Sequence, residues 1–371
     1  MKTIGVLAVC ALVLAAWPFD KKKKKNDEDV TQVLQLPKDP PSAVVAETAK
    51  LVFRVSPLSA KGLLSQQVRD ALKALHRSGG NESIVKLRAF VAGSGDMRRV
   101  QAIVSETYTD KHLALPALSV VQVGGLPMEG AQVVLESTSV AKKDVNPNGL
   151  VLISGQGVVE DKPLQPIVPL AEKTLNLVRT ALKGAGGEPE DVLRGTCFLS
   201  SLDAVARVRD LFQSEYPAAA WDYVQLQRAP VHSVVECEAV ARSRVKIAKP
   251  VELINPDGLP KSPNYSQVAL VGAPHIAITG TQVAFGFQDS DVRLAFGRLE
   301  KELAQVHASV KDVAWSSIYP LSNSIADQVR KIRFEFYDKA RPPAATMQPF
   351  EGLPSMDASF AVDAIAVAAE Q

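Results

Sequence analysis

The 371-residue chain has few of the residues from which metal centres and nucleic-acid interfaces are built. Its three cysteines and five histidines show no metal-ligand spacing. A net charge of +2, with basic residues spread along the chain, gives no reason to expect a nucleic-acid partner. We therefore expect no metal and no cofactor. Cys197 and Cys237 each lie in a strand-like run, and we expect them to be small core residues rather than a disulfide or metal pair.

The first 16 residues resemble an export signal. Lys2 precedes an apolar run at 4–16 that is too short for a comfortable transmembrane span. The five lysines at 21–25 oppose clean export, because positive flanks tend to stay in the cytoplasm. We expect a periplasmic or secreted protein, with a cytoplasmic or membrane-anchored one as the alternatives. Residues 17–42 are charged and then proline-rich, which is typical of a linker.

The remaining chain repeats one pattern three times, with a period of about 100–120 residues. The second copy is the clearest. A strand-like run ends at Ser154-Gly155-Gln156, and amphipathic helical patterns follow over 170–182 and 204–216. Each helix needs a sheet to cover its apolar face. The predicted domains span 43–141, 148–244 and 251–368.

The second copy has the order strand-Ser-Gly-Gln, helix, Ala-Gly-Gly, Glu-Asp-Val, strand, helix and Val-Glu-x-Glu-Ala-x-Ala, which ends at Ala241. This order resembles the Rid (YjgF-type) family, formerly called endoribonuclease L-PSP. The resemblance implies an α/β (α+β) fold of the chorismate-mutase-like type, in which each domain is a mixed sheet with two helices on one face. Family members form closed trimers with ligand clefts between subunits. Three copies in one chain therefore imply a monomer with internal three-fold pseudo-symmetry, an internal pseudo-trimer, with small-molecule ligands in the inter-domain clefts.

The resemblance also locates an arginine that holds the substrate carboxylate in the family's deaminases, eight residues before the leucine of a Leu-Pro motif. A bidentate guanidinium suits a planar carboxylate, and lysine would replace it poorly. No copy of this chain has arginine there. The equivalent positions hold Leu118, Trp221 and Ala345.

A second family element is a glutamate that orients the hydrolytic water. It survives as Glu236, while the equivalents are Val134 and Ala361. We therefore predict Glu236 as the catalytic residue. Glu238 lies two residues along the same strand, on the same face, and is a candidate ligand contact. Because the other copies keep this second acid as Glu136 and Asp363, pairing with a neighbour across an interface is the structural alternative.

Four further residues are candidate ligand contacts. Ser154 and Thr279 occupy the family's Ser-Gly turn, Tyr265 lies in its opening motif, and Trp221 would form an apolar wall. The hydroxyl groups have an equally plausible structural role, which is to satisfy nearby backbone groups. Gly155 is expected to allow the turn itself.

These observations support three functions. The first is a hydrolase of reactive enamine or imine compounds, with weak or altered specificity because the arginine is absent. The second is a non-catalytic protein that binds small molecules in an apolar cleft near Trp221 or Leu118. The third is a partner-binding or structural module.

Overall fold

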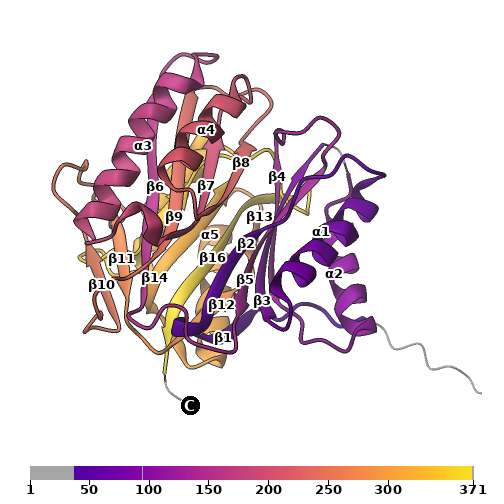
Figure 1. The fold of residues 1–371 in the computed structure, drawn as a ribbon, viewed down its shortest axis with the longest axis horizontal. Helices are drawn as coiled ribbons and strands as arrows, with labels where there is room; N and C mark the ends of the chain where they lie inside the picture. The colour runs from indigo at the N-terminus through magenta and orange to yellow at the C-terminus, as the bar shows by residue number, and fades with distance from the viewer. Residues whose placement is uncertain (1–36, 94, 370–371) are drawn as a thin grey trace, which may run out of the picture. The chain divides into compact units, whose positions relative to one another are not determined.

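The computed structural model describes residues 37–93 and 95–369. The expected signal at 1–16 lies outside the described residues, as does the linker as far as residue 36. The described chain forms three mixed sheets with helices packed against them (Figure 1). The predicted α+β class with three sheets is confirmed.

The first sheet has the strand order β2-β5-β3-β4, and β3 and β4 are parallel. Helices α1 and α2 bury their apolar stripes against it, since residues such as Val68, Leu72 and Leu75 recur at helical spacing. Its elements are β2 (Leu51–Val55), α1 (Leu64–Gly79), β3 (Ser83–Ala92), α2 (Arg98–Asp110), β4 (Ala117–Val123) and β5 (Val133–Val140).

The second sheet has the order β10-β11-β6-β9-β7-β8. The helical patterns expected at 170–182 and 204–216 are present as α3 and α4, which cover the core of this sheet. Its elements are β6 (Leu150–Glu160), α3 (Ile167–Gly184), the 3-10 turn η2 (Pro189–Asp191), β7 (Val192–Leu199), α4 (Val205–Glu215), β8 (Ala220–Gln225), β9 (Ser233–Arg242), β10 (Val251–Ile254) and β11 (Val268–Val271).

The third sheet has the order β1-β12-β16-β14-β15, and β13 also pairs with β16. Its elements are β1 (Ala43–Glu47), β12 (His275–Thr279), β13 (Gln282–Phe285), α5 (Asp289–Gln305), β14 (Ala308–Pro320), α6 (Asn323–Ile332), the 3-10 turn η3 (Arg333–Glu335), β15 (Ala344–Met347) and β16 (Ala358–Ala368).

Strands are exchanged between the sheets. β1 lies just before β2 in the sequence, separated only by the 3-10 turn η1 (Thr48–Lys50), yet it pairs with β12 of the third sheet. β10 and β11 lie just before β12, yet β11 pairs with β6 of the second sheet. Each exchange joins two sheets by backbone hydrogen bonds. Sequence periodicity identifies such strands but does not reveal their pairing partners, because the pattern along one strand is the same whichever neighbour it has.

Equivalent strands of the three sheets meet in one aromatic cluster. Phe90 on β3, Phe198 on β7 and Tyr319 on β14 share it with Phe350. The ring centroids of Phe90 and Phe198 are 6.0 Å apart, and those of Tyr319 and Phe350 are 5.2 Å apart. The three sheets therefore share one buried aromatic cluster.

A central ion network lies beside these rings and consists of Lys86, Arg88, Glu136, Arg194, Glu238 and Asp363. Arg88 Nε donates to Glu136 in its own sheet at 2.6 Å, and Arg88 Nη2 donates to Glu238 of the second sheet at 2.6 Å. Lys86 Nζ lies 3.2 Å from Asp363 of the third sheet. The acids are buried, so these bonds supply the counter-charges that buried carboxylates require.

Cys197 and Cys237 form a disulfide, so the prediction that they are unpaired core residues was wrong. Both are buried beneath α3 and α4, as expected of core residues. The register of β7 and β9 places them directly opposite each other, with Cα atoms 4.1 Å apart. The pairing could not be predicted from the sequence, because the strand register that brings the two cysteines together is a property of the tertiary structure.

Candidate functional site

Glu236 lies on β9 with its carboxyl group packed against β6. Gly155 and Gly157 form the floor, because a Cβ atom on Gly155 would lie 2.2 Å from Glu236 Oε1 and one on Gly157 would lie 2.8 Å from Oε2. The expectation that Gly155 serves a turn was wrong. β6 runs through this residue, with a shift of register between Ile153 and Gln156. Glycine is needed here because the carboxyl group approaches the backbone closely.

The third sheet supplies the opposite side of the site. Gln348, directly after β15, donates its Nε2 hydrogen to Glu236 Oε2 at 2.6 Å. The pKa of Glu236 is raised to about 7, mainly by burial and to a smaller extent by the charge of nearby Glu238. The hydrogen bond from Gln348 and the charge of Arg330 oppose this rise. The pKa of Tyr265 is also raised, by burial and then by Glu236. The site is therefore a carboxyl group whose protonation changes near neutral pH.

A cleft of about 590 Å³ opens between the second and third sheets, and Gln348, the hydrogen-bond partner of Glu236, lines it, whereas Glu236 itself does not. Gln348 and Arg330 line it, as does Val234, two residues before Glu236 on the same face of β9. Its volume is in the range of small-molecule sites. The wall from the second sheet is mostly apolar, with Val159, Leu226, Pro230, Val231 and Val234, but it also includes Ser200, Gln227 and His232. The wall from the third sheet is mostly polar, with Ser322, Asn323, Asp327, Arg330 and Gln348, and it also includes Leu321 and Pro349.

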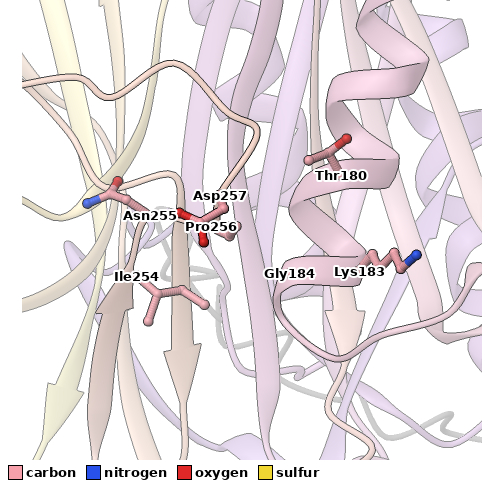
Figure 2. A pocket seen from close by; sticks show the side chains of 7 residues that line it. All are labelled: Thr180, Lys183, Gly184, Ile254, Asn255, Pro256 and Asp257. Atoms are coloured by element: carbon pink, nitrogen blue, oxygen red, sulfur yellow. The ribbon is translucent and has the colours of Figure 1, made fainter.

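A second hollow, of about 520 Å³, lies where the segment after β10 meets the end of α3 (Figure 2). A Cβ atom on Gly184 would lie 2.3 Å from Cβ of Pro256, so the two segments touch there. Lys183 points away from Asp257 in Figure 2. Because its charged groups do not converge, we interpret this hollow as the packing seam of an exchanged hairpin.

Within residues 37–93 and 95–369, no group of three or more histidine, cysteine, aspartate or glutamate side chains is arranged to hold a metal ion. No helix in the same part of the chain is long and apolar enough to cross a membrane.

Residues 137–246 match the family model described as Endoribonuclease L-PSP. This segment contains Ser154, the glycine floor and Glu236. The chain carries a domain of the YjgF/Rid family. A comparison with curated proteins finds no match.

Solved structures of the same family resemble parts of the chain. A Rid-family protein of unknown function from Yersinia pestis is 16% identical, with 32% of this chain and 99% of that chain covered and a TM-score of 0.30. A YjgF-family protein from Neisseria meningitidis is 13% identical, with 33% and 97% covered and a TM-score of 0.24. A family member from Mycobacterium tuberculosis is 21% identical, with 32% and 98% covered and a TM-score of 0.24.

Two of the predicted ligand contacts bind backbone groups in the structure. Ser154 Oγ donates to the carbonyl of Ser266 at 2.6 Å and accepts from the amide of Ala345 at 2.9 Å, so it ties β15 to β6. Thr279 Oγ1 accepts from the amide of Ala364 at 2.9 Å. Both side chains are fully buried. Their hydroxyl groups therefore satisfy backbone, which was the structural alternative.

The other predicted contacts are Tyr265, Trp221 and Glu238. The charge of Glu236 adds to the rise that burial causes in the pKa of Tyr265. Trp221 packs its ring against Phe212 and Tyr216 in the core of the second sheet. Glu238 bonds Arg88 across the interface of the first and second sheets. The structure places Trp221 and Glu238 away from the cleft, and the role of Tyr265 as a ligand contact stays a prediction.

Sequence reasoning did not identify Gln348, Arg330 or Gly157. Gln348 lies three residues after Ala345, at a position where no motif predicts a polar side chain. Arg330 lies in the last turn of the amphipathic helix α6, on the polar face, where an arginine usually faces solvent. Gly157 follows the Ser-Gly-Gln motif by one residue. Gly155 and Gly157 alternate along β6 and lie against Glu236 on the paired strand β9, and this alternation could have indicated a close approach of the acid to the backbone.

Proposed function

We propose that this YjgF/Rid protein hydrolyses a reactive imine or enamine in the cleft between the second and third sheets, with Glu236 as the proton-transfer group. The observation that carries the proposal is the buried Glu236 carboxyl, which is fixed by Gln348, a residue that lines a cleft of about 590 Å³. A group with a pKa of about 7 is available as both base and acid near neutral pH.

The reaction balances with one water molecule. The Glu236 carboxylate accepts a proton from water as the water oxygen bonds to the imine carbon. The protonated carboxyl then returns that proton to the nitrogen, which gives a carbinolamine. The Glu236 carboxylate next takes the hydroxyl proton of the carbinolamine and delivers it to the nitrogen, the carbon–nitrogen bond breaks as the carbon–oxygen double bond forms, and ammonia leaves with a carbonyl product. An enamine enters this scheme after tautomerisation to its imine. Glu236 is unchanged at the end of the cycle, as a general acid–base catalyst must be.

The specificity of this site should differ from that of the family's deaminases. The three positions of the family arginine hold Leu118, Trp221 and Ala345, which face Leu87, Gly195 and Ser316 in the three parallel strand pairs. None of the three is charged. Loss of a buried charge-assisted contact costs about 2–5 kcal/mol, so 2-imino acids should bind weakly.

The assay measures ammonia and keto-acid release from freshly generated 2-iminobutyrate and 2-aminoacrylate. We expect release above the buffer rate from the full chain and release at the buffer rate from Glu236→Ala. Glu160→Ala, which removes an exposed acid at the end of β6, is the control and should retain activity. Equal rates for the native chain and Glu236→Ala would refute the mechanism.

A non-catalytic binding function is the second candidate. The apolar wall of the cleft, with Val159 and Val231 both more than half exposed, favours it. Such a surface suits an apolar ligand group. A metabolite that raises the melting temperature of the native chain, without being consumed, would favour binding over hydrolysis.

We also propose that the protein is an exported monomer with no nucleic-acid partner. The central ion network, which already joins all three sheets, supports a self-contained particle. The apolar run at 4–16 and the buried disulfide support an oxidising compartment outside the cytoplasm. Light scattering during size-exclusion chromatography should report the mass of one chain, and a mass of two or three chains would refute the monomer.

A further inference from the structure

We propose that Gln348 is the positioning residue of the Glu236 site, holding the carboxyl group in one orientation from the opposite side of the cleft. This inference rests on the proposed function, in which Glu236 transfers the proton. Gln348 Nε2 lies 2.6 Å from Glu236 Oε2, while Gly155 and Gly157 form the floor below the carboxyl group. A carboxyl group held from both sides has little freedom to rotate.

The same geometry distinguishes the two carboxyl oxygens. Oε2 is occupied by the amide of Gln348. Oε1 is the carboxyl oxygen closest to Gly155, and no side chain in the described ranges donates a hydrogen bond to it. Oε1 is therefore the oxygen that remains for a reacting water molecule. General acid–base catalysis needs this proton acceptor within hydrogen-bond reach of the water, and a fixed carboxyl group provides it.

The backbone on both sides of Gln348 is tied to the second sheet. Before it, the amide of Ala345 donates to Ser154 Oγ at 2.9 Å. After it, Gln227 Nε2 donates to the carbonyl of Phe350 at 3.0 Å. Pro349 follows Gln348 directly and restricts both residues to extended backbone. The second sheet, which carries Glu236, thus sets where the Gln348 amide lies.

Several groups besides Gln348 act on the pKa of Glu236. Glu238 on the same strand raises the pKa of Glu236, and Arg330 on α6 lowers it. Tyr265, from the segment before β11, is another titratable group whose pKa is coupled to the charge of Glu236. The amide of Gln348 donates to the ionised carboxylate and so favours the charged form. Its removal should raise the pKa, while a cation in its place should lower it.

The experiment follows the carboxyl resonance of Glu236 by NMR during a pH titration of the full chain labelled with ¹³C at the glutamate carboxyl. The absence of one resonance in Glu236→Gln assigns it. Gln348→Leu should raise the pKa of Glu236 by about one pH unit, because a hydrogen bond to a charged group is lost. Gln348→Lys should lower it. Gln122→Leu removes a half-buried amide from the first sheet and should leave the titration unchanged.

The two Gln348 variants must shift the titration in opposite directions. Shifts in the same direction, or no shift in either variant, would overturn the positioning role. The readout does not depend on turnover. If the titrations shift as expected while the native chain releases no ammonia, the proposed function fails and the contact stands. Ammonia release with unshifted titrations would reject only the role of Gln348.

Discussion

Glu236 and Glu238 lie two residues apart on the same face of β9, yet their carboxyl groups have different hydrogen-bond partners. Glu238 accepts a bond from Arg88 at 2.6 Å, and Arg88 also holds Glu136. Glu236 is held by the neutral amide of Gln348. One acid lies in the central ion network, and the other is bonded to a residue that lines the cleft.

The pKa values follow from these partners. Burial alone would raise the pKa of Glu136, but Arg194 and Arg88 bring it below its ordinary value. Burial raises the pKa of Glu236 to about 7, and no cation touches it closely enough to reverse this. The pKa of a buried carboxyl on these strands is therefore lowered where a guanidinium bonds it, as at Glu136, and raised where a neutral amide does, as at Glu236. That conclusion is open to test by removing each partner in turn.

The largest expected effect comes from Arg88→Met. Loss of Arg88 leaves Glu136 and Glu238 buried without their shared cation, and breaking a buried pair in this way costs about 3–5 kcal/mol of unfolding free energy. Urea denaturation measures it. Arg179→Met, which removes an exposed pair with Glu215, should cost at most about 1 kcal/mol. Similar losses in the two variants would contradict the distinction between the regions.

The next effect is pH-dependent and comes from Glu236→Gln. The pKa of Glu236 is raised in the folded chain from an ordinary value of 4.5 to about 7, so the folded state binds this proton more tightly than the unfolded state. The stability that Glu236 contributes is full below pH 4.5 and is lost as the pH rises to 7. At pH 8 the variant should be more stable than the native chain by roughly 3 kcal/mol.

The difference between the two chains should disappear near pH 4, where Glu236 is protonated in both states. Denaturation midpoints at pH 4, 6 and 8 measure it. If the unfolding free energies of the native chain and Glu236→Gln changed in parallel with pH, the pKa of Glu236 would not be raised in the folded chain. The difference in pKa between Glu236 and Glu136 would then be refuted.

A smaller effect on stability is expected from Gly155→Ala. The new Cβ would meet Glu236 Oε1 at 2.2 Å, so the carboxyl group must leave its place and lose the bond from Gln348. Overpacking of this kind costs about 1–3 kcal/mol. Any hydrolytic activity should fall as far as in Glu236→Ala.

A double-mutant cycle isolates this contact. In the Glu236→Ala background the Gly155→Ala substitution should cost much less, because the colliding side chain is gone. Gly297→Ala, at a position on α5 with no atom within 4 Å of the added Cβ, is the control and should stabilise the helix slightly. Additive costs in the cycle would show that the glycine floor does not serve Glu236.

Much of the architecture could be predicted from the sequence because it depends on local patterns. Amphipathic spacing identified α3 and α4, and the repeated turn and Leu-Pro motifs indicated three related units. Glu236 could be chosen because two equivalent positions hold Val134 and Ala361, which cannot transfer protons. These inferences need only the order of residues and the period of a helix or strand.

Other properties required the tertiary structure, because they depend on which segments meet. The exchange of β1 and β11 between sheets, the disulfide of Cys197 and Cys237, and the placing of Gln348 over Glu236 all join residues far apart in the sequence. Strand periodicity shows which face a side chain takes but not what lies opposite. The sequence alone determined that an acid survives in the second copy. Only the packing of the third sheet against the second decided that this acid is buried beside an amide and not beside an arginine.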